Sequence, residues 1–208
     1  MGSTIDNLRI TGSLTVHDAA IPAQTRATIL KQDANAIFPV PLTSLRVWDA
    51  YQTNLPGTAA TDDLALVGGT FGTSPPVISA GDLKAAGATT RYARCQIQLP
   101  ECYVSAETVT LSLSAGMVTT VADTACTVDV ECYRIDKVGG IGADLCATAA
   151  TTINSLTFGA KAFTITSTSL VAGDVLDVRI AITCTDAATG TAVTPTIGAI
   201  DLLCDIKG

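Results

Sequence analysis

The sequence predicts an all-β protein, an antiparallel β-sandwich of the jelly-roll type that is preceded by an extended N-terminal arm. The first observation is that apolar and polar residues alternate with a period of two. For example, apolar residues alternate with Thr and Ser at Val109, Leu111, Leu113 and Ala115. Such alternation is typical of antiparallel strands that cover a core on one face. The second is the absence of long helical patterns. The third is length, because 208 residues exceed the roughly 100 residues of an immunoglobulin-type sandwich and suit an eight-stranded jelly roll.

The strands are expected where apolar alternation or a short apolar run is bounded by Gly, Pro or Asp. These segments are 42–48, 77–79, 92–99, 108–115, 125–133, 162–166, 174–184 and 197–206. Only 21–35 and 145–155 carry a pattern that could form a short helix. Residues 51–76 are rich in Gly and Pro and predict a long surface loop.

The first 41 residues differ from the body of the chain. They contain apolar residues on both sides of a Thr-Gly-Ser turn but too few to form a core. We therefore expect residues 1–41 to form an arm or small hairpin, and residues 42–208 to form the sandwich domain. The arm either packs on the sandwich or lies on another chain.

Composition excludes several classes of function. Lys and Arg number 12 against 19 Asp and Glu, a net charge of −7, and nucleic-acid binding requires a positive field. No apolar run is long enough for a membrane helix. The N-terminus lacks the basic and apolar segments of a secretory signal, so synthesis in a cytoplasm is expected.

The seven cysteines are an odd number, so at least one is unpaired. Five of them occupy positions on apolar strand faces where Val or Ile would fit: Cys95, Cys126, Cys132, Cys184 and Cys204. We expect reduced, buried thiols, with a native disulfide as the alternative. A zinc site is not expected, because there is no C-x-x-C and one histidine.

Catalytic residues are not evident. His17 lies in the arm, without the rigid pocket that a catalytic imidazole needs. Asp129 and Glu131 share a strand face about 7 Å apart, a spacing compatible with a glycosidase pair and equally with solvated charges. Gly139–Gly142 does not match a phosphate-binding loop. The prediction is therefore of no enzymatic activity, no catalytic residues and no cofactor.

Loops with acidic residues could in principle hold a structural calcium ion, and these residues are Asp123, Asp136, Asp144 and Asp186. None of them belongs to a D-x-D-x-D-G pattern, so no metal site is predicted. Trp48 is the sole tryptophan, and we interpret it either as an interface residue or as a core residue at a strand end.

Several segments resemble structural proteins of tailed bacteriophages. The similar segments are 91–100 with Tyr103 and Val104, 115–123, the ending 205–208 and the opening 5–14. Within that group the chain resembles a capsid decoration (cement) protein, and a trimeric one with a jelly-roll body and an arm would suit its length and β content. The resemblance implies a location on the capsid surface of a virion, a major capsid protein as partner and self-association as a homotrimer. No membrane and no small-molecule ligand are expected.

The residues that we expect to contact such a partner lie mostly in the arm. They are Ile5, Leu8, Ile10, Leu14, Val16, Ile21, Arg26, Arg46 and Trp48. The alternative is a tail-fibre or carbohydrate-recognition β-sandwich, in which Trp48, Tyr51, Tyr92 or Tyr103 would form an aromatic platform. An enzyme built on Asp129 and Glu131 is the third hypothesis.

Overall fold

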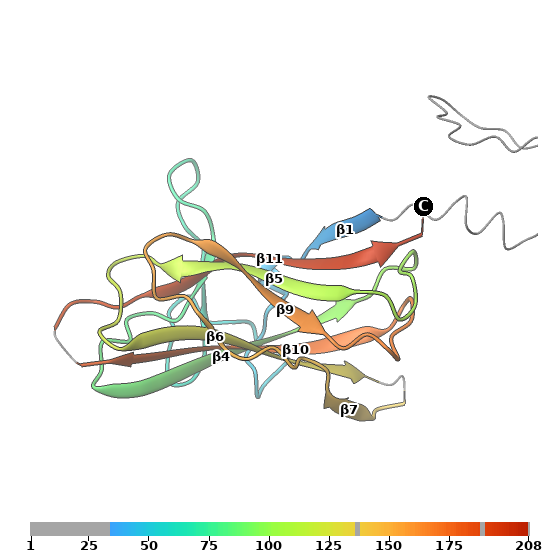
Figure 1. Ribbon diagram of the computed structural model, residues 1–208. Helices are drawn as coiled ribbons and strands as arrows, with labels where there is room; N and C mark the ends of the chain where they lie inside the picture. Colours follow the sequence, from blue (N-terminus) through green and yellow to red (C-terminus); the bar gives the residue numbers. More distant parts are fainter. Residues whose placement is uncertain (1–33, 136–137, 188–189, 208) are drawn as a thin grey trace, which may run out of the picture.

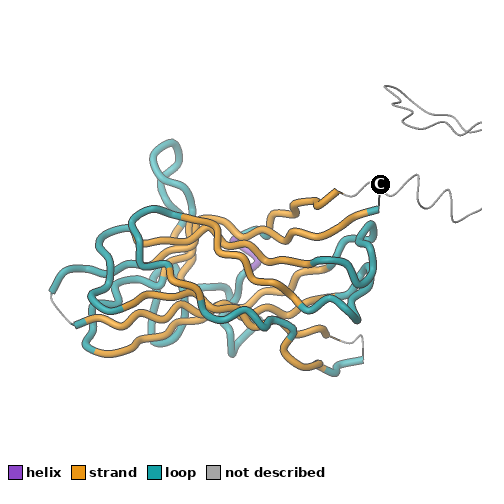
Figure 2. Tube along the Cα trace, in the orientation of Figure 1, coloured by secondary structure: helices purple, strands orange, loops and turns teal. Residues whose placement is uncertain are grey.

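The computed structural model describes residues 34–135, 138–187 and 190–207, and these form two antiparallel sheets packed face to face (Figure 1). Strands make up both layers, and most of the connecting loops lie at the two ends of the sandwich (Figure 2). The predicted all-β sandwich is confirmed. Within the described residues, no helix has the length and apolar character needed to cross a membrane.

The larger sheet, sheet A, has six strands. Its order is β2 (Ala65–Val67), β3 (Val77–Ser79), β11 (Pro195–Ile206), β5 (Val109–Met117) and β9 (Gly159–Ile165), with β1 (Ala34–Pro39) also paired to β11. Sheet B has five strands. Its order is β4 (Gly87–Gln98), β10 (Val175–Asp186), β6 (Ala125–Ile135) and β7 (Ile141–Asp144), with β8 (Thr151–Thr152) also paired to β6.

The strand pairing is nested, as in a jelly roll. β3 pairs with β11, β4 with β10, β5 with β9, and β6 with β7 and β8. The chain is thus one long antiparallel hairpin rolled into two sheets. The pairing of β3 with β11 joins strands more than 100 residues apart in the sequence, because Ile78 is the register partner of Ile197.

One hydrophobic core lies between the inner faces of the two sheets. Leu111 and Leu113 of β5, Phe163 of β9, Val128 of β6 and Ile180 of β10 are at most 1% exposed. Burial of each such side chain contributes about 1.5–3 kcal/mol relative to exposure. The period-two pattern of the sequence is therefore the inner and outer alternation of these strands.

The cysteines on strand faces are buried as predicted, but two of them form a disulfide. Cys126 of β6 and Cys184 of β10 are direct register partners on the inner face, with their Cα atoms 4.1 Å apart. The expectation that all five thiols are reduced is therefore wrong. The remaining three, Cys95, Cys132 and Cys204, are free and fully buried.

Other expectations also differ from the structure. The segment 42–48 is not a strand, because it begins with a 3-10 turn, Leu42–Ser44, in which the Ser44 amide donates to the Pro41 carbonyl. The segment 145–155 is not a helix and contains β8. Residues 34–41 of the predicted arm join the sandwich, since β1 pairs with β11. Residues 1–33 lie outside the described residues.

Candidate functional site

The outer face of sheet B collects the polar side chains that alternate with the core positions. The register of β4, β10 and β6 arranges them in rows of three cross-strand neighbours. In the sheet order β4, β10, β6 the rows are Thr90–Thr183–Thr127, Tyr92–Ala181–Asp129, Arg94–Arg179–Glu131 and Gln96–Asp177–Tyr133. We call these twelve residues the sheet B outer face.

A loop brings two more aromatic rings to this face. The free edge of β4 is paired with the loop, because Arg46 and Arg94 exchange backbone hydrogen bonds of 2.8 and 3.0 Å. Further along, the Tyr92 amide donates to the Asp62 carbonyl at 2.7 Å. Trp48 and Tyr51 lie between these two anchoring points in the sequence, so the loop is held where their rings reach the sheet.

The aromatic rings and the guanidinium groups are stacked. The Cζ atom of Arg179 lies 5.3 Å from the centre of the Trp48 ring and 5.0 Å from that of Tyr92. The Trp48 and Tyr92 ring centres are 5.1 Å apart. Arg94 lies 5.2 Å from the centre of the Tyr51 ring. Such cation–π contacts fix the orientation of both partners.

Each of these two arginines is also paired with a carboxylate. Arg94 donates to both oxygens of Asp177, with Nε 2.7 Å from Oδ1. Arg179 donates to Glu131 Oε1 at 2.6 Å. These hydrogen bonds raise the pKa of both guanidinium groups, so both arginines stay charged and both charges are neutralised locally.

A hollow of about 200 Å³ lies on this face above Ala181. Ala181 is the smallest side chain of the twelve, and its register partners Tyr92 and Asp129 stand on either side of it. The hollow is also lined by Arg179 and Glu131, and by Ala150 from the segment before β8. The face therefore combines an aromatic wall, hydroxyl groups and carboxylates around one depression.

Two of the predicted partner-binding residues, Arg46 and Trp48, lie beside this face. Ile5, Leu8, Ile10, Leu14, Val16, Ile21 and Arg26 lie outside the described residues, and so does His17. Tyr103, proposed as part of a platform, is fully buried instead and donates its hydroxyl to the Glu107 carbonyl at 2.6 Å. Asp129 and Glu131 share the predicted face, but Glu131 is held by Arg179.

Sequence analysis missed the hollow and the role of Ala181. Tyr92, Asp129 and Ala181 are each recognisable as outward-facing residues from the alternation of their own strands. Their proximity depends on the register of β4 and β6 against β10, which the alternation does not specify. The aromatic residues and the pair Asp129 and Glu131 are the sequence signals that point toward this face.

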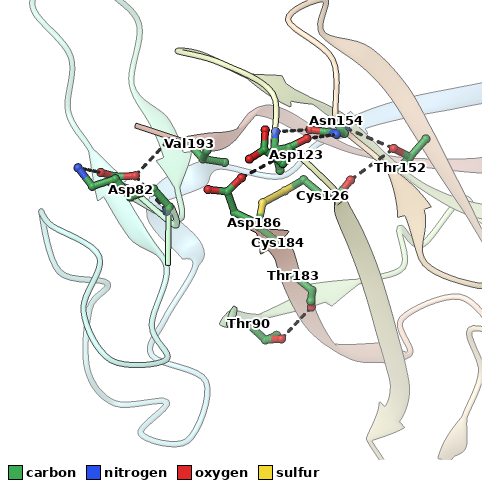
Figure 3. The surroundings of a disulfide bond; sticks show 12 residues. Asp82, Thr90, Asp123, Cys126, Thr152, Asn154, Thr183, Cys184, Asp186 and Val193 are labelled. Atoms are coloured by element: carbon green, nitrogen blue, oxygen red, sulfur yellow. Dashed lines mark hydrogen bonds and ion pairs between the residues drawn. A yellow bond between two sulfur atoms is a disulfide. The ribbon is translucent and has the colours of Figure 1, made fainter. Parts of the chain in front are cut away.

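No group of three or more His, Cys, Asp or Glu that could hold a metal ion occurs within the part of the chain that the structure describes. Of the acidic residues considered for calcium, Asp186 is 4% exposed and accepts a hydrogen bond from the Asp123 amide at 3.0 Å. It lies beside the disulfide at the end of β10 (Figure 3). Its second oxygen has no hydrogen-bond partner among the described residues.

Comparison with known proteins gives structural likenesses only. No protein-family model matches the sequence, and no characterised protein matches it by sequence. The xylan-binding module CBM15 is similar at a TM-score of 0.42 and 12% identity, over 84% of this chain and 100% of that one. The CBM22-1 xylan-binding domain from Paenibacillus barcinonensis Xyn10C is similar at 0.38 and 10%, over 83% and 88% of the two chains.

A viral protein is also among the similar structures. A chain of the infectious bursal disease virus Gx strain has a TM-score of 0.34 and 13% identity, over 65% of this chain and 34% of that one. At these low scores the likenesses carry no conclusion about function. The function must be inferred from the residues of this chain.

Proposed function

We propose that this protein is a carbohydrate-recognition module, which binds a glycan on the sheet B outer face and does not alter it chemically. The observation that carries the proposal is the gathering of aromatic residues. The chain has four tyrosines and one tryptophan. Trp48, Tyr51, Tyr92 and Tyr133 all lie at this face, and only Tyr103 belongs to the core.

The chemistry of the face suits a sugar. A pyranose ring offers apolar C–H groups, which pack on aromatic rings, and hydroxyl groups, which both donate and accept hydrogen bonds. The face supplies aromatic rings together with the carboxylates of Asp129 and Glu131 and the guanidinium of Arg179. Convergent polar groups beside aromatic side chains are typical of ligand sites.

Binding without catalysis fits the state of the carboxylates. A glycosidase requires one carboxylic acid to donate a proton while a second carboxylate acts as base or nucleophile. Glu131 is engaged with Arg179 at 2.6 Å, so one of its oxygens is already held in an ion pair. One oxygen of Asp129, Oδ1, already accepts a hydrogen bond from the Val130 amide at 2.9 Å.

Titration with soluble neutral polysaccharides, followed by Trp48 fluorescence and by calorimetry, tests the proposal. We expect saturable binding, and a loss of about tenfold or more in affinity for Tyr92→Ala, as for a central aromatic contact. The matched control is Phe71→Ala, because Phe71 is fully exposed in the loop between β2 and β3, two strands of sheet A, and does not line the hollow. Equal losses for both variants, or no binding of any glycan, would reject the proposal.

The second candidate is the virion decoration protein, a homotrimer on the capsid surface that binds the major capsid protein. One observation favours it. β1, the segment that follows the N-terminal residues, is attached by strand pairing to β11 and leaves Ile37 64% exposed. Addition of a strand to a sheet edge is a common mode of protein recognition. Light scattering at three times 21.2 kDa and co-sedimentation with capsids would support it, and a monomer that does not sediment would reject it.

A further inference from the structure

We propose that the hollow above Ala181 is the subsite for a single uncharged sugar unit, with Ala181 as the residue that makes room for it. This inference rests on the proposed function. It specifies where on the sheet B outer face a glycan is bound and which class of sugar binds there.

The shape of the hollow follows from the register. In the row Tyr92–Ala181–Asp129, a methyl group stands between a tyrosine ring and a carboxylate. The neighbouring row toward one end consists of three threonines, and the neighbouring row toward the other end contains Arg179 and Glu131. Larger side chains thus surround the smallest one. The volume of about 200 Å³ lies below the roughly 300–1,000 Å³ of pockets for drug-sized ligands, so it suits one sugar unit.

The hydrogen-bonding groups in the hollow complement vicinal hydroxyls. The Oγ1 atoms of Thr90 and Thr183 are 2.8 Å apart and share one hydrogen bond (Figure 3). One threonine donates to the other, so the second hydroxyl proton is left to donate to a ligand. In the neighbouring row, the carboxylate of Asp129 offers hydrogen-bond acceptor oxygens. A donor and an acceptor therefore face the same depression, as two neighbouring sugar hydroxyls require.

The charges select against acidic sugars. The cation at the hollow, Arg179, is already paired with Glu131, and Arg94 in the same row is paired with Asp177. Asp129 forms no ion pair with any described residue, so the hollow carries the surplus negative charge of one carboxylate. A uronic acid or a sulfated sugar would place a like charge beside Asp129, whereas a neutral sugar would donate hydroxyl protons to it.

The test compares three variants by calorimetric titration with a neutral polysaccharide and with a uronic-acid polysaccharide. Ala181→Val fills the hollow and suits a strand, and we expect it to weaken neutral-glycan binding by about tenfold or more. Asp129→Asn should weaken neutral binding and reduce the preference over the uronic acid. Ala162→Val, at an exposed position of β9 in the other sheet, is the matched control and should bind as the wild type does.

The outcomes separate the two proposals. Neutral-glycan binding by the wild type that Ala181→Val leaves unchanged would place the subsite elsewhere on the face, which overturns this inference and leaves the proposed function standing. Equal affinity of the wild type for the uronic acid would overturn the assigned sugar class. A wild type that binds neither polysaccharide would overturn both proposals. Circular dichroism of each variant distinguishes lost binding from lost folding.

Discussion

Asp63 is a carboxylate held in an unfavourable position beside the proposed binding face. Its Oδ1 atom is buried, and no residue in the described part of the chain forms a hydrogen bond with it. Burial, together with the negative charges of Asp62 and Asp49, raises the pKa of Asp63 above its ordinary value. The neighbouring Asp62 does have a hydrogen-bond partner, because its Oδ2 atom accepts a hydrogen bond from Trp48 Nε1 at 3.0 Å. The loop that contains Trp48 therefore holds three aspartates, Asp49, Asp62 and Asp63, whose negative charges repel one another.

The pKa of Asp63 predicts how a substitution there changes stability with pH. A carboxyl group whose pKa is higher in the folded state favours folding in acid, and this contribution is lost as the pH rises through the folded-state pKa. Asp63→Asn should therefore raise the free energy of unfolding at pH 7, and the gain should vanish near about pH 3, below the ordinary pKa of Asp. Urea unfolding at both pH values measures it, with Asp201→Asn on sheet A as control. A gain that is equal at both pH values would contradict the assigned cause.

The strands show which elements the sequence can predict. β6 and β10 alternate between core and surface over most of their length, so the sequence predicts them nearly to their ends. β7 was missed because all four of its residues are exposed, which leaves no alternation to detect. The predicted strand at 42–48 failed because the Pro41 carbonyl starts a turn instead. The residue types of the site were visible in the sequence, but their arrangement depends on the register between strands.

Gly116 of β5 provides a test of packing between a strand and a loop. A Cβ atom placed on it would lie 3.0 Å from Phe158 Cδ2 and 3.1 Å from the Ser155 carbonyl oxygen. The loop before β9 thus packs directly on this glycine. Gly116→Ala should lower the free energy of unfolding by about 1–3 kcal/mol, as overpacking does.

The control for Gly116→Ala is Gly142→Ala in β7. A Cβ atom at Gly142 would meet only the Arg134 carbonyl oxygen, at an ordinary 3.7 Å. Thermal unfolding of both variants beside the wild type gives the comparison. A Gly116→Ala protein as stable as the Gly142→Ala protein would show that Phe158 and its loop can move away at no cost.

The last strand, β11, links several strands of sheet A to one another. β11 pairs with β1, β3 and β5, and it is the only described strand with three partners in sheet A. Its inner face also supplies buried residues to the shared core, among them Ile197, Ile200 and Leu202. Because both sheets share that core, the domain should unfold as one cooperative unit.

Removal of residues 195–208 is therefore expected to unfold the entire domain and not sheet A alone. Far-UV circular dichroism would report the loss of strands, and Trp48 fluorescence would report the loss of the sheet B outer face, which lies in the other layer. Removal of residues 207–208 alone is the control and should leave both signals unchanged. Retention of the native Trp48 signal in the longer truncation would mean that sheet B is stable independently.

The pairing of β1 with β11 has a practical consequence for how this fold could be attached to other proteins. Ala34 and Ile206 are register partners, so the polypeptide enters and leaves the sandwich at adjacent points (Figure 1). Domains with neighbouring ends tolerate insertion into an exposed loop of a host protein. A graft of residues 34–206 would need only short connectors, and the sugar-binding surface proposed here would remain open to solvent in the chimera.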